Sequence, residues 1–197
     1  MPRAAPYDRD AALDAAMSLF WDKGYHATSL KELESALRMK PGSIYAAFKS
    51  KENLYLLALE RYFTNSRRRF RKQVAQAASP LQGLADHLRS YARLSGDDAA
   101  RKACMLTKTM IDTRSTDPAI AERSRAYLRA MRAEIAGAFE AAKARGELPP
   151  NADPDRHARR YQANLTALRL ELHQGAGQAD LEDLAEDMAR EVEALAP

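Results

Sequence analysis

The segment SLKELESALRMKPGSIYAAFKSK, residues 29–51, predicts two short helices separated by a tight turn. Ser29 followed three residues later by Glu32 matches a capping box, which marks the start of a helix. Leucines at helical spacing then give this helix a buried side, formed by Leu30, Leu33 and Leu37. The pattern stops at Arg38, and Pro41 restarts it because proline is favoured at the first position of a helix.

The second short helix has an apolar side and an exposed side. Its apolar residues are Ile44, Tyr45 and Phe48. It ends by Lys49 and is followed by Lys51, so two cations stand beside it. Two short helices joined by a turn of three or four residues and packed under a longer first helix are typical of a helix-turn-helix. The exposed second helix of such a motif can enter the major groove of DNA.

Longer helices are predicted on both sides of this motif. The helix before it has an apolar stripe of Leu13, Met17, Phe20 and Trp21 and stops at Gly24, so the motif spans residues 8–48. After it, Ser50 caps a helix that we expect to reach Ala77. Further helices are expected at roughly residues 80–95, 102–114, 117–145, 153–174 and 180–196.

The composition favours an all-α fold. Hydrophobic residues make up 46% of the 197 residues and charged residues 29%, and alanine, leucine, arginine and glutamate dominate over the β-branched residues that strands prefer. We therefore expect a three-helix helix-turn-helix domain over residues 1–50 and a larger helical domain over residues 51–197.

The charge permits binding to a polyanion. The net charge is +4, and the segment from Arg61 to Lys72 contains six basic residues and no acidic one. This segment is either a solvated helix face or a supporting contact to DNA phosphates.

Several protein classes are not expected. No apolar run is long enough to span a membrane and the first residues lack an apolar signal core, which indicates a cytoplasmic protein without a membrane partner. A single cysteine cannot form an internal disulfide, and the four histidines lack metal-ligand spacing. Because nucleophile-elbow and phosphate-binding glycine motifs are also missing, we expect no enzyme activity, metal or cofactor.

The last two predicted helices carry long apolar stripes. These stripes include Leu165, Leu168 and Leu172 in the first helix and Leu184, Met188 and Val192 in the second. They can pack against the same chain or against a second copy. With two helices from each subunit, a homodimer would have a four-helix bundle as its interface, and we assign these six residues to it.

Several fragments in the N-terminal part agree in order and spacing with a known family. They are Leu-Phe at 19–20, Gly-Tyr at 24–25, Thr-Ser-Leu at 28–30, Gly-Ser-Ile-Tyr at 42–45, Phe48, and Lys-Glu at 51–52. On these residues, the stretch from Leu13 to Leu57 resembles the N-terminal domain of the TetR family of transcriptional repressors. Beyond Tyr62 the likeness is looser, although Ala-Cys-Met-Leu at 103–106 and Ala-Arg-Gly-Glu-Leu at 144–148 are similar to one C-terminal subgroup.

The resemblance implies a two-fold symmetric dimer on a palindromic DNA operator. It also implies that residues 51–197 hold a pocket for a small-molecule effector, whose binding releases the protein from DNA. The residues at the family's phosphate-contacting positions are Thr28, Ser29, Tyr45 and Lys51, and those at its base-contacting positions are Gly42, Ser43 and Ala46. Three turn residues depart from the family pattern. Arg38 stands where the family usually has a glycine, Lys40 stands where it has a capping serine or threonine, and Pro41 stands where it often has a basic residue. Lys40, Pro41 and Lys49 complete the predicted DNA-binding set.

The effector pocket has candidate residues that are polar or polarisable and lie near apolar helix faces. They are His87, Tyr91, Met105, Thr109, Tyr127, Met131, Asn164 and His173, and each can equally be an ordinary core residue. Cys104 stands near Lys102 and Lys108, whose charges can lower a thiol pKa, so it is either a redox or electrophile sensor or a buried inert cysteine.

The sequence thus favours a ligand-responsive regulator of transcription, acting as a repressor. Two alternatives stay open. One is a helical DNA-binding or interaction protein without a small-molecule effector, which either binds DNA by charge alone or keeps the same fold and depends on a protein partner or on the dimer level. The other is a cysteine-based sensor on the same fold.

Overall fold

The computed structural model describes residues 8–94 and 103–197, and every regular element in these ranges is a helix. The predicted all-α fold is therefore confirmed. The chain divides into two compact units, which we call the N-terminal unit (Met1–Thr64 and Met105–Tyr127) and the C-terminal unit (Asn65–Cys104 and Leu128–Pro197). This division differs from the predicted boundary after residue 50, because a segment from the middle of the chain joins the N-terminal helices.

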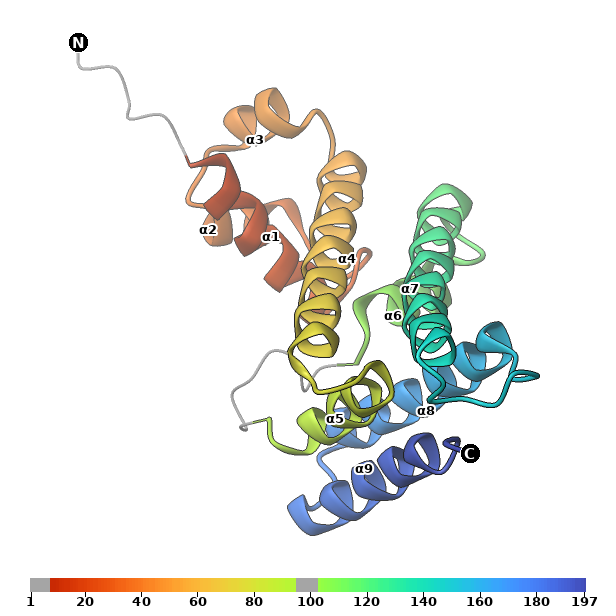
Figure 1. The fold of residues 1–197 in the computed structure, drawn as a ribbon. Coiled ribbons are helices and arrows are strands. Elements are labelled where there is room, and N and C mark those ends of the chain that lie inside the picture. The colour runs from red at the N-terminus through yellow and green to blue at the C-terminus, as the bar shows by residue number, and fades with distance from the viewer. Residues whose placement is uncertain (1–7, 95–102) are drawn as a thin grey trace. The chain divides into compact units, whose positions relative to one another are not determined.

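The N-terminal unit contains the helix-turn-helix (Figure 1). Its helices are α1 (Arg9–Lys23), α2 (Leu30–Leu37), α3 (Pro41–Phe48), the first part of α4 (Lys51–Gln76), α6 (Met105–Thr113) and the start of α7 (Pro118–Ala144). Aromatic side chains join α1 to α4: the rings of Phe20 and Tyr55 lie 4.7 Å apart and those of Trp21 and Tyr62 4.9 Å apart, both edge to face. Such pairs add to the stabilisation from burial alone.

Local signals set the ends of α1. Asp8 caps its first turn by accepting hydrogen bonds from the N–H groups of Asp10 and Ala11. Gly24 ends it with a φ of 86°, a conformation that favours glycine. Helix α6 contacts this end, because the Lys108 ammonium donates to the carbonyl oxygen of Asp22 at 2.8 Å.

The C-terminal unit has its core around α5 (Pro80–Ala92). Helix α5 packs against α8 (Pro154–Gln174) and α9 (Gln178–Glu193), which lie beside it in Figure 1. The core also takes in the last part of α4 and most of α7, and its fully buried side chains include Leu84, Leu88 and Phe139. A charged cluster ties α5 to α9, since the Arg89 guanidinium donates to both Glu186 and Glu193 at 2.6 Å.

Helices α5, α7 and α8 each begin at a proline, close to the predicted starts at residues 80, 117 and 153. Ser79 and Asp153, each directly before a proline, cap α5 and α8 by accepting hydrogen bonds from backbone N–H groups. Helix α7 begins at Pro118. Helix α6 begins at Met105, and the predicted start at residue 102 lies outside the described residues.

Candidate nucleic-acid interface

Helices α2 and α3 pack through their apolar sides. Leu33 and Leu37 of α2 are buried, as are Ile44 and Phe48 of α3. Met39, in the turn between the helices, is buried with them. Because these side chains anchor both helices, α3 is held as a short surface helix with its other side turned to solvent.

The turn contains a residue in the left-handed conformation. Arg38 ends α2 with φ 52° and ψ 40°, and both its N–H and that of Met39 donate to the carbonyl oxygen of Glu34. Side chains other than glycine disfavour this conformation by roughly 1–2 kcal/mol. The position where the resemblance implies a glycine therefore does require a glycine-like backbone, and the arginine there is strained.

The outward face of α3 carries most of the predicted DNA-binding residues. The exposed residues among them are Lys40, Pro41, Gly42, Ser43, Tyr45, Ala46 and Lys49. The assignment of Tyr45 to the apolar side of this helix was wrong, because 46% of the residue is exposed. Its position next to Ile44, which is buried, explains the difference, since neighbouring helix residues point about 100° apart.

The amino end of α3 is open to an external partner. Lys40 is its N-cap residue but makes no side-chain hydrogen bond there, and Pro41 has no backbone N–H. A Cβ added at Gly42 would meet nothing within 4 Å, and Gly42 is not among the glycines with positive φ. Neither packing nor backbone conformation therefore requires glycine at this position. The partial positive charge of a helix amino end suits a phosphate or a closely approaching base.

Cations surround this helix. Lys40 and Lys49 are exposed, while Lys51 is half-buried with its ammonium 4.7 Å from the centre of the Tyr25 ring. Burial lowers the pKa of Lys51, and the charges of nearby acidic residues oppose that shift. Sequence reasoning missed Arg9, whose guanidinium lies 5.3 Å from the centre of the Phe48 ring. No local pattern could place it there, because the two residues meet only through the packing of α1 with α3.

Two predicted phosphate contacts are occupied within the protein. Thr28 is 1% exposed and its hydroxyl donates to the carbonyl oxygen of Gly24 at 2.7 Å, so the predicted contact by this side chain is wrong. Ser29 is exposed, and its side chain forms the predicted capping box with Glu32. Hydrogen bonds from Lys23 and Ser29 lower the pKa of Glu32 to about 2.

The basic segment from Arg61 to Lys72 is partly neutralised within the chain. Arg61 pairs with Asp14 at 2.6 Å and Asp10 at 2.7 Å. Arg67 and Arg71 both pair with the carboxylate of Glu134. The segment is therefore in part an internal network of ion pairs.

In the C-terminal unit, the structure brings two of the predicted pocket residues together. The rings of His87 and Tyr91 lie 5.3 Å apart, and the buried His87 makes a 2.7 Å hydrogen bond to the hydroxyl of Tyr161. Arg169, also buried, lies over the ring of Tyr91 at 5.6 Å. Tyr161 and Arg169 were not predicted, since their helical spacing marked them only as ordinary residues of α8.

The other predicted pocket residues of the C-terminal unit lie apart. Met131 packs partly buried against the core cluster. Asn164 is half-buried, and its amide nitrogen lies 3.5 Å from a carboxylate oxygen of Glu191. His173 is exposed.

Three predicted pocket residues belong to the N-terminal unit instead. Met105 and Thr109 are buried in α6, and the Thr109 hydroxyl lies 2.7 Å from that of Tyr55. Tyr127 stacks on Phe63 with 4.6 Å between ring centres. The eight candidates are thus divided between the two units, and their role in a pocket stays a prediction.

The apolar stripes of α8 and α9 face their own chain. Leu168, Leu172 and Val192 are buried in core clusters, so their assignment to a dimer interface was wrong, because a covered side chain cannot contact a second copy. Leu165, Leu184 and Met188 pack partly buried against the same clusters. Between Ala163 and Leu170, the exposed residues of α8 are instead uncharged, namely Ala163, Thr166, Ala167 and Leu170.

Cys104 is half-buried, and its role as a sensor stays a prediction. Lys102, which entered that argument, lies outside the described residues. Over residues 8–94 and 103–197, the structure has no helix long and apolar enough to cross a membrane. The same ranges contain no group of three or more histidine, cysteine or acidic side chains placed to hold a metal ion.

Comparison with known proteins identifies both parts of the chain. Residues 12–58 match the family described as "Bacterial regulatory proteins, tetR family", and residues 77–180 match "Tetracyclin repressor-like, C-terminal domain". HTH-type transcriptional repressor ComR of Escherichia coli strain K12 is 32% identical over 187 residues, which cover 93% of this chain and 88% of that protein.

Solved structures of TetR regulators have a similar fold. A cysteine mutant of the TetR family transcriptional regulator CifR, complexed with 26bp double-strand operator DNA, is 28% identical with a TM-score of 0.86, and the match covers 96% of this chain and 98% of that one. A TetR transcriptional regulator from Chloroflexus aurantiacus J-10-FL is 27% identical with a TM-score of 0.80, covering 95% of both chains.

Proposed function

The chain belongs to the TetR family of bacterial regulatory proteins, and on this premise we propose that it is a homodimeric repressor that a small molecule releases from a palindromic operator. Like other members, it is a DNA-binding transcriptional regulator and not an enzyme. The proposal depends above all on the outward face of α3, which is exposed, flanked by lysines and open at its amino end. A regulator of this kind acts in the cytoplasm, where bacterial DNA lies.

The residues of α3 divide into two roles in this proposal. Ser43 and Ala46 face the bases, Ala46 through apolar contact with thymine methyl groups, and Gly42 lets the backbone approach them. Lys40 and Lys49 neutralise phosphates on either side, and the exposed Tyr45 hydroxyl donates to a phosphate oxygen. Few base contacts are available from such short side chains, so DNA shape contributes to selection.

Dimerisation uses the exposed side of α8 in this proposal. Ala163, Ala167 and Leu170 lie on one side of the helix, and a second copy can cover them by the same surface, as two-fold symmetry demands. Leu170 is 48% exposed, so its apolar side chain is available to a second copy. The CifR relative is bound to a 26bp duplex, which is long enough for half-sites on successive turns.

Helix α4 provides the route from effector to DNA. Its residues up to Thr64 belong to the N-terminal unit and those from Asn65 belong to the C-terminal unit. We assume two positions of α4. A ligand that binds the protein better when the C-terminal end of α4 is in one of these positions shifts the population of the whole helix toward that position. The separation of the two α3 helices in the dimer then no longer matches the half-sites, and affinity for DNA falls.

The decisive experiment is selection of binding sites from a random-sequence duplex library, followed by mobility-shift titration with random competitor DNA. A specific regulator holds its selected site about 10³-fold or more above random DNA. Tyr45→Phe removes one hydroxyl from each subunit and should weaken this binding by about a hundredfold, because each lost hydrogen bond to a charged group costs about tenfold. In the homodimer, Lys40→Ala removes one phosphate contact from each subunit, so it should reduce the slope of log affinity against log salt concentration by about 1.8, twice the contribution of one contact.

Lys72→Ala is the matched control, because Lys72 is an exposed lysine of α4 in the C-terminal unit. It removes the same charge but should leave the salt slope unchanged. If Lys72→Ala and Lys40→Ala weaken binding equally and no sequence is enriched, the protein binds DNA by charge alone and the proposal is wrong.

A further inference from the structure

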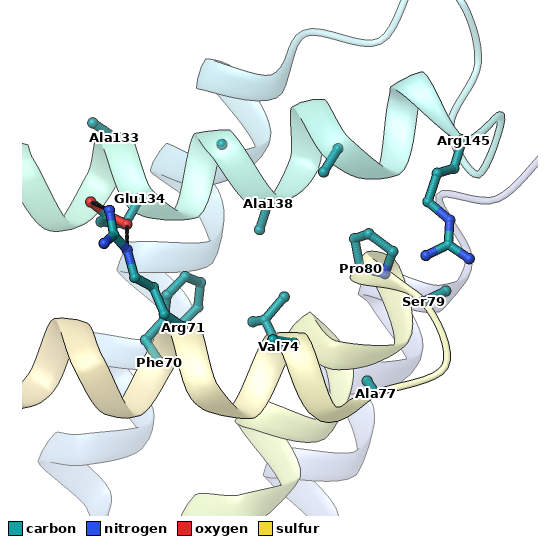
Figure 2. A pocket seen from close by; sticks show the side chains of 13 residues that line it. Phe70, Arg71, Val74, Ala77, Ser79, Pro80, Ala133, Glu134, Ala138 and Arg145 are labelled. Carbon is teal, nitrogen blue, oxygen red and sulfur yellow. Dashed lines mark hydrogen bonds and ion pairs between the residues drawn. The ribbon is translucent and has the colours of Figure 1, made fainter.

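A groove in the C-terminal unit has no role in the function proposed so far. It has a volume of about 560 Å³ and lies between the end of α4, the start of α5 and the second half of α7 (Figure 2). Its floor is apolar and includes Phe70, Val74 and Ala138. This volume falls within the range of small-molecule sites, about 300–1,000 Å³. None of the pocket residues expected from the sequence lines it.

The fold does not explain why residue 137 in this groove is a glycine. Gly137 lies exposed in the second half of α7 and lines the groove. A Cβ at this position would meet nothing within 4 Å, and Gly137 is not among the glycines with positive φ. Glycine weakens a helix interior more than any residue except proline, so neither packing nor conformation accounts for it. A molecule that approaches the helix backbone through the groove would require it.

The charges at the groove favour an anion at one end. Arg71 lines the groove, and it and Arg67 both donate to the carboxylate of Glu134 at 2.6 Å, as Figure 2 shows for Arg71. Two guanidinium groups therefore share one carboxylate, which leaves one excess positive charge. Arg71 is 57% exposed, so its remaining donors are accessible.

At the other end of the groove the charges cancel. Arg145 lies 3.2 Å from the carboxylate of Glu147 and donates to the carbonyl oxygen of Ala78 at 3.4 Å. One positive charge meets one negative charge here. Between the two ends, the lining side chains of Val74, Gly137 and Ala141 are apolar or absent.

We propose that this groove binds an amphipathic monoanion, namely a linear apolar chain with a single carboxylate, whose head pairs with Arg71 and whose chain lies over Val74 and Gly137. Charge complementarity supports this occupant, because the excess of one positive charge matches one carboxylate and the planar guanidinium suits its geometry. The occupant touches the C-terminal part of α4, so it would be the effector. Only this last step rests on the proposed function.

The test uses sodium dodecanoate below its micelle concentration as the probe, titrated calorimetrically into the full-length protein without DNA. Wild type should bind one dodecanoate per subunit. Arg71→Gln should weaken binding by about tenfold or more, the effect of losing a charge-assisted hydrogen bond. Gly137→Leu should abolish it by filling the groove. Arg145→Gln at the balanced end should change affinity by less than about threefold, the size expected for an exposed ion pair.

Two controls separate groove binding from other effects. Ala119→Leu adds a similar side chain at an exposed position of α7 in the N-terminal unit and should bind as wild type does. Gly137→Leu should unfold at a temperature no lower than wild type, because leucine is the better helix former. Dodecan-1-ol, which lacks the charge, should bind at least about tenfold more weakly than dodecanoate.

The inference is overturned if wild type does not bind dodecanoate, if Gly137→Leu binds it as well as wild type, or if the alcohol binds equally. These outcomes are independent of DNA. If wild type selects an operator but does not bind dodecanoate, the groove proposal fails alone. If dodecanoate binds in the groove but no operator is selected, the proposed function fails alone. If the protein both selects an operator and binds dodecanoate in the groove, saturating dodecanoate should lower its affinity for the operator.

Discussion

Acidification should destabilise this protein through His87. The hydroxyl of Tyr161 donates to the carbonyl oxygen of Leu84 at 2.9 Å, so its oxygen accepts a hydrogen bond from Nδ1–H of His87. This hydrogen bond therefore requires a proton on Nδ1 of His87. Burial, followed by the positive charges of Arg169 and Arg69, lowers the pKa of His87 to about 3.

The direction and size of the effect follow from proton linkage. A histidine in the unfolded chain has a pKa of about 6.5, so the unfolded state binds more protons than the folded state at any pH below that value. The contribution of the neutral His87 to the free energy of unfolding is therefore fully present above the unfolded-state pKa. It is lost as the pH is lowered toward the folded-state pKa. Between pH 7 and pH 5, His87 alone should remove about 2 kcal/mol from the free energy of unfolding.

The measurement is urea unfolding followed by circular dichroism at pH 7 and pH 5, at one protein concentration. His87→Gln is the comparison, since glutamine can still donate to Tyr161 but does not titrate. Other groups whose protonation changes with folding, including His157, are present in both proteins and cancel. Wild type should lose about 2 kcal/mol more than the variant. Equal losses in the two proteins would show that His87 is not held neutral by its surroundings.

Three further predictions concern single positions. Arg38→Gly should raise the free energy of unfolding by about 0.5–1 kcal/mol, because it relieves the left-handed conformation at a smaller cost in chain entropy, and denaturant titration measures this. Gly83→Ala should lower it by about 1–3 kcal/mol in the same assay, because the added Cβ would lie 2.9 Å from backbone atoms of Val74. Leu170→Glu should convert a dimer into a monomer in light scattering coupled to size-exclusion chromatography, since it places a charge in the proposed interface. A dimer that persists would exclude this face of α8.

The positions of the helices and of the helix-turn-helix followed from residues close together in the chain. The capping box at Ser29 and Glu32, the Ser-Pro and Asp-Pro starts, and the glycine stop at residue 24 act within one helical turn, so their effect does not depend on the rest of the fold. For the same reason, the amino-acid sequence alone was enough to predict that lysines stand beside α3.

Tertiary packing decided the rest, because an apolar stripe does not specify what covers it. Leu168 and Val192 fit a dimer interface and an internal core equally well by pattern, and only the position of α5 shows that the chain buries them itself. Thr28 is turned inward by a hydrogen bond that depends on how the chain leaves α1. The groove beside Gly137 and the sharing of Glu134 by two arginines arise where α4 meets α7, two helices far apart in sequence whose pairing no local signal encodes.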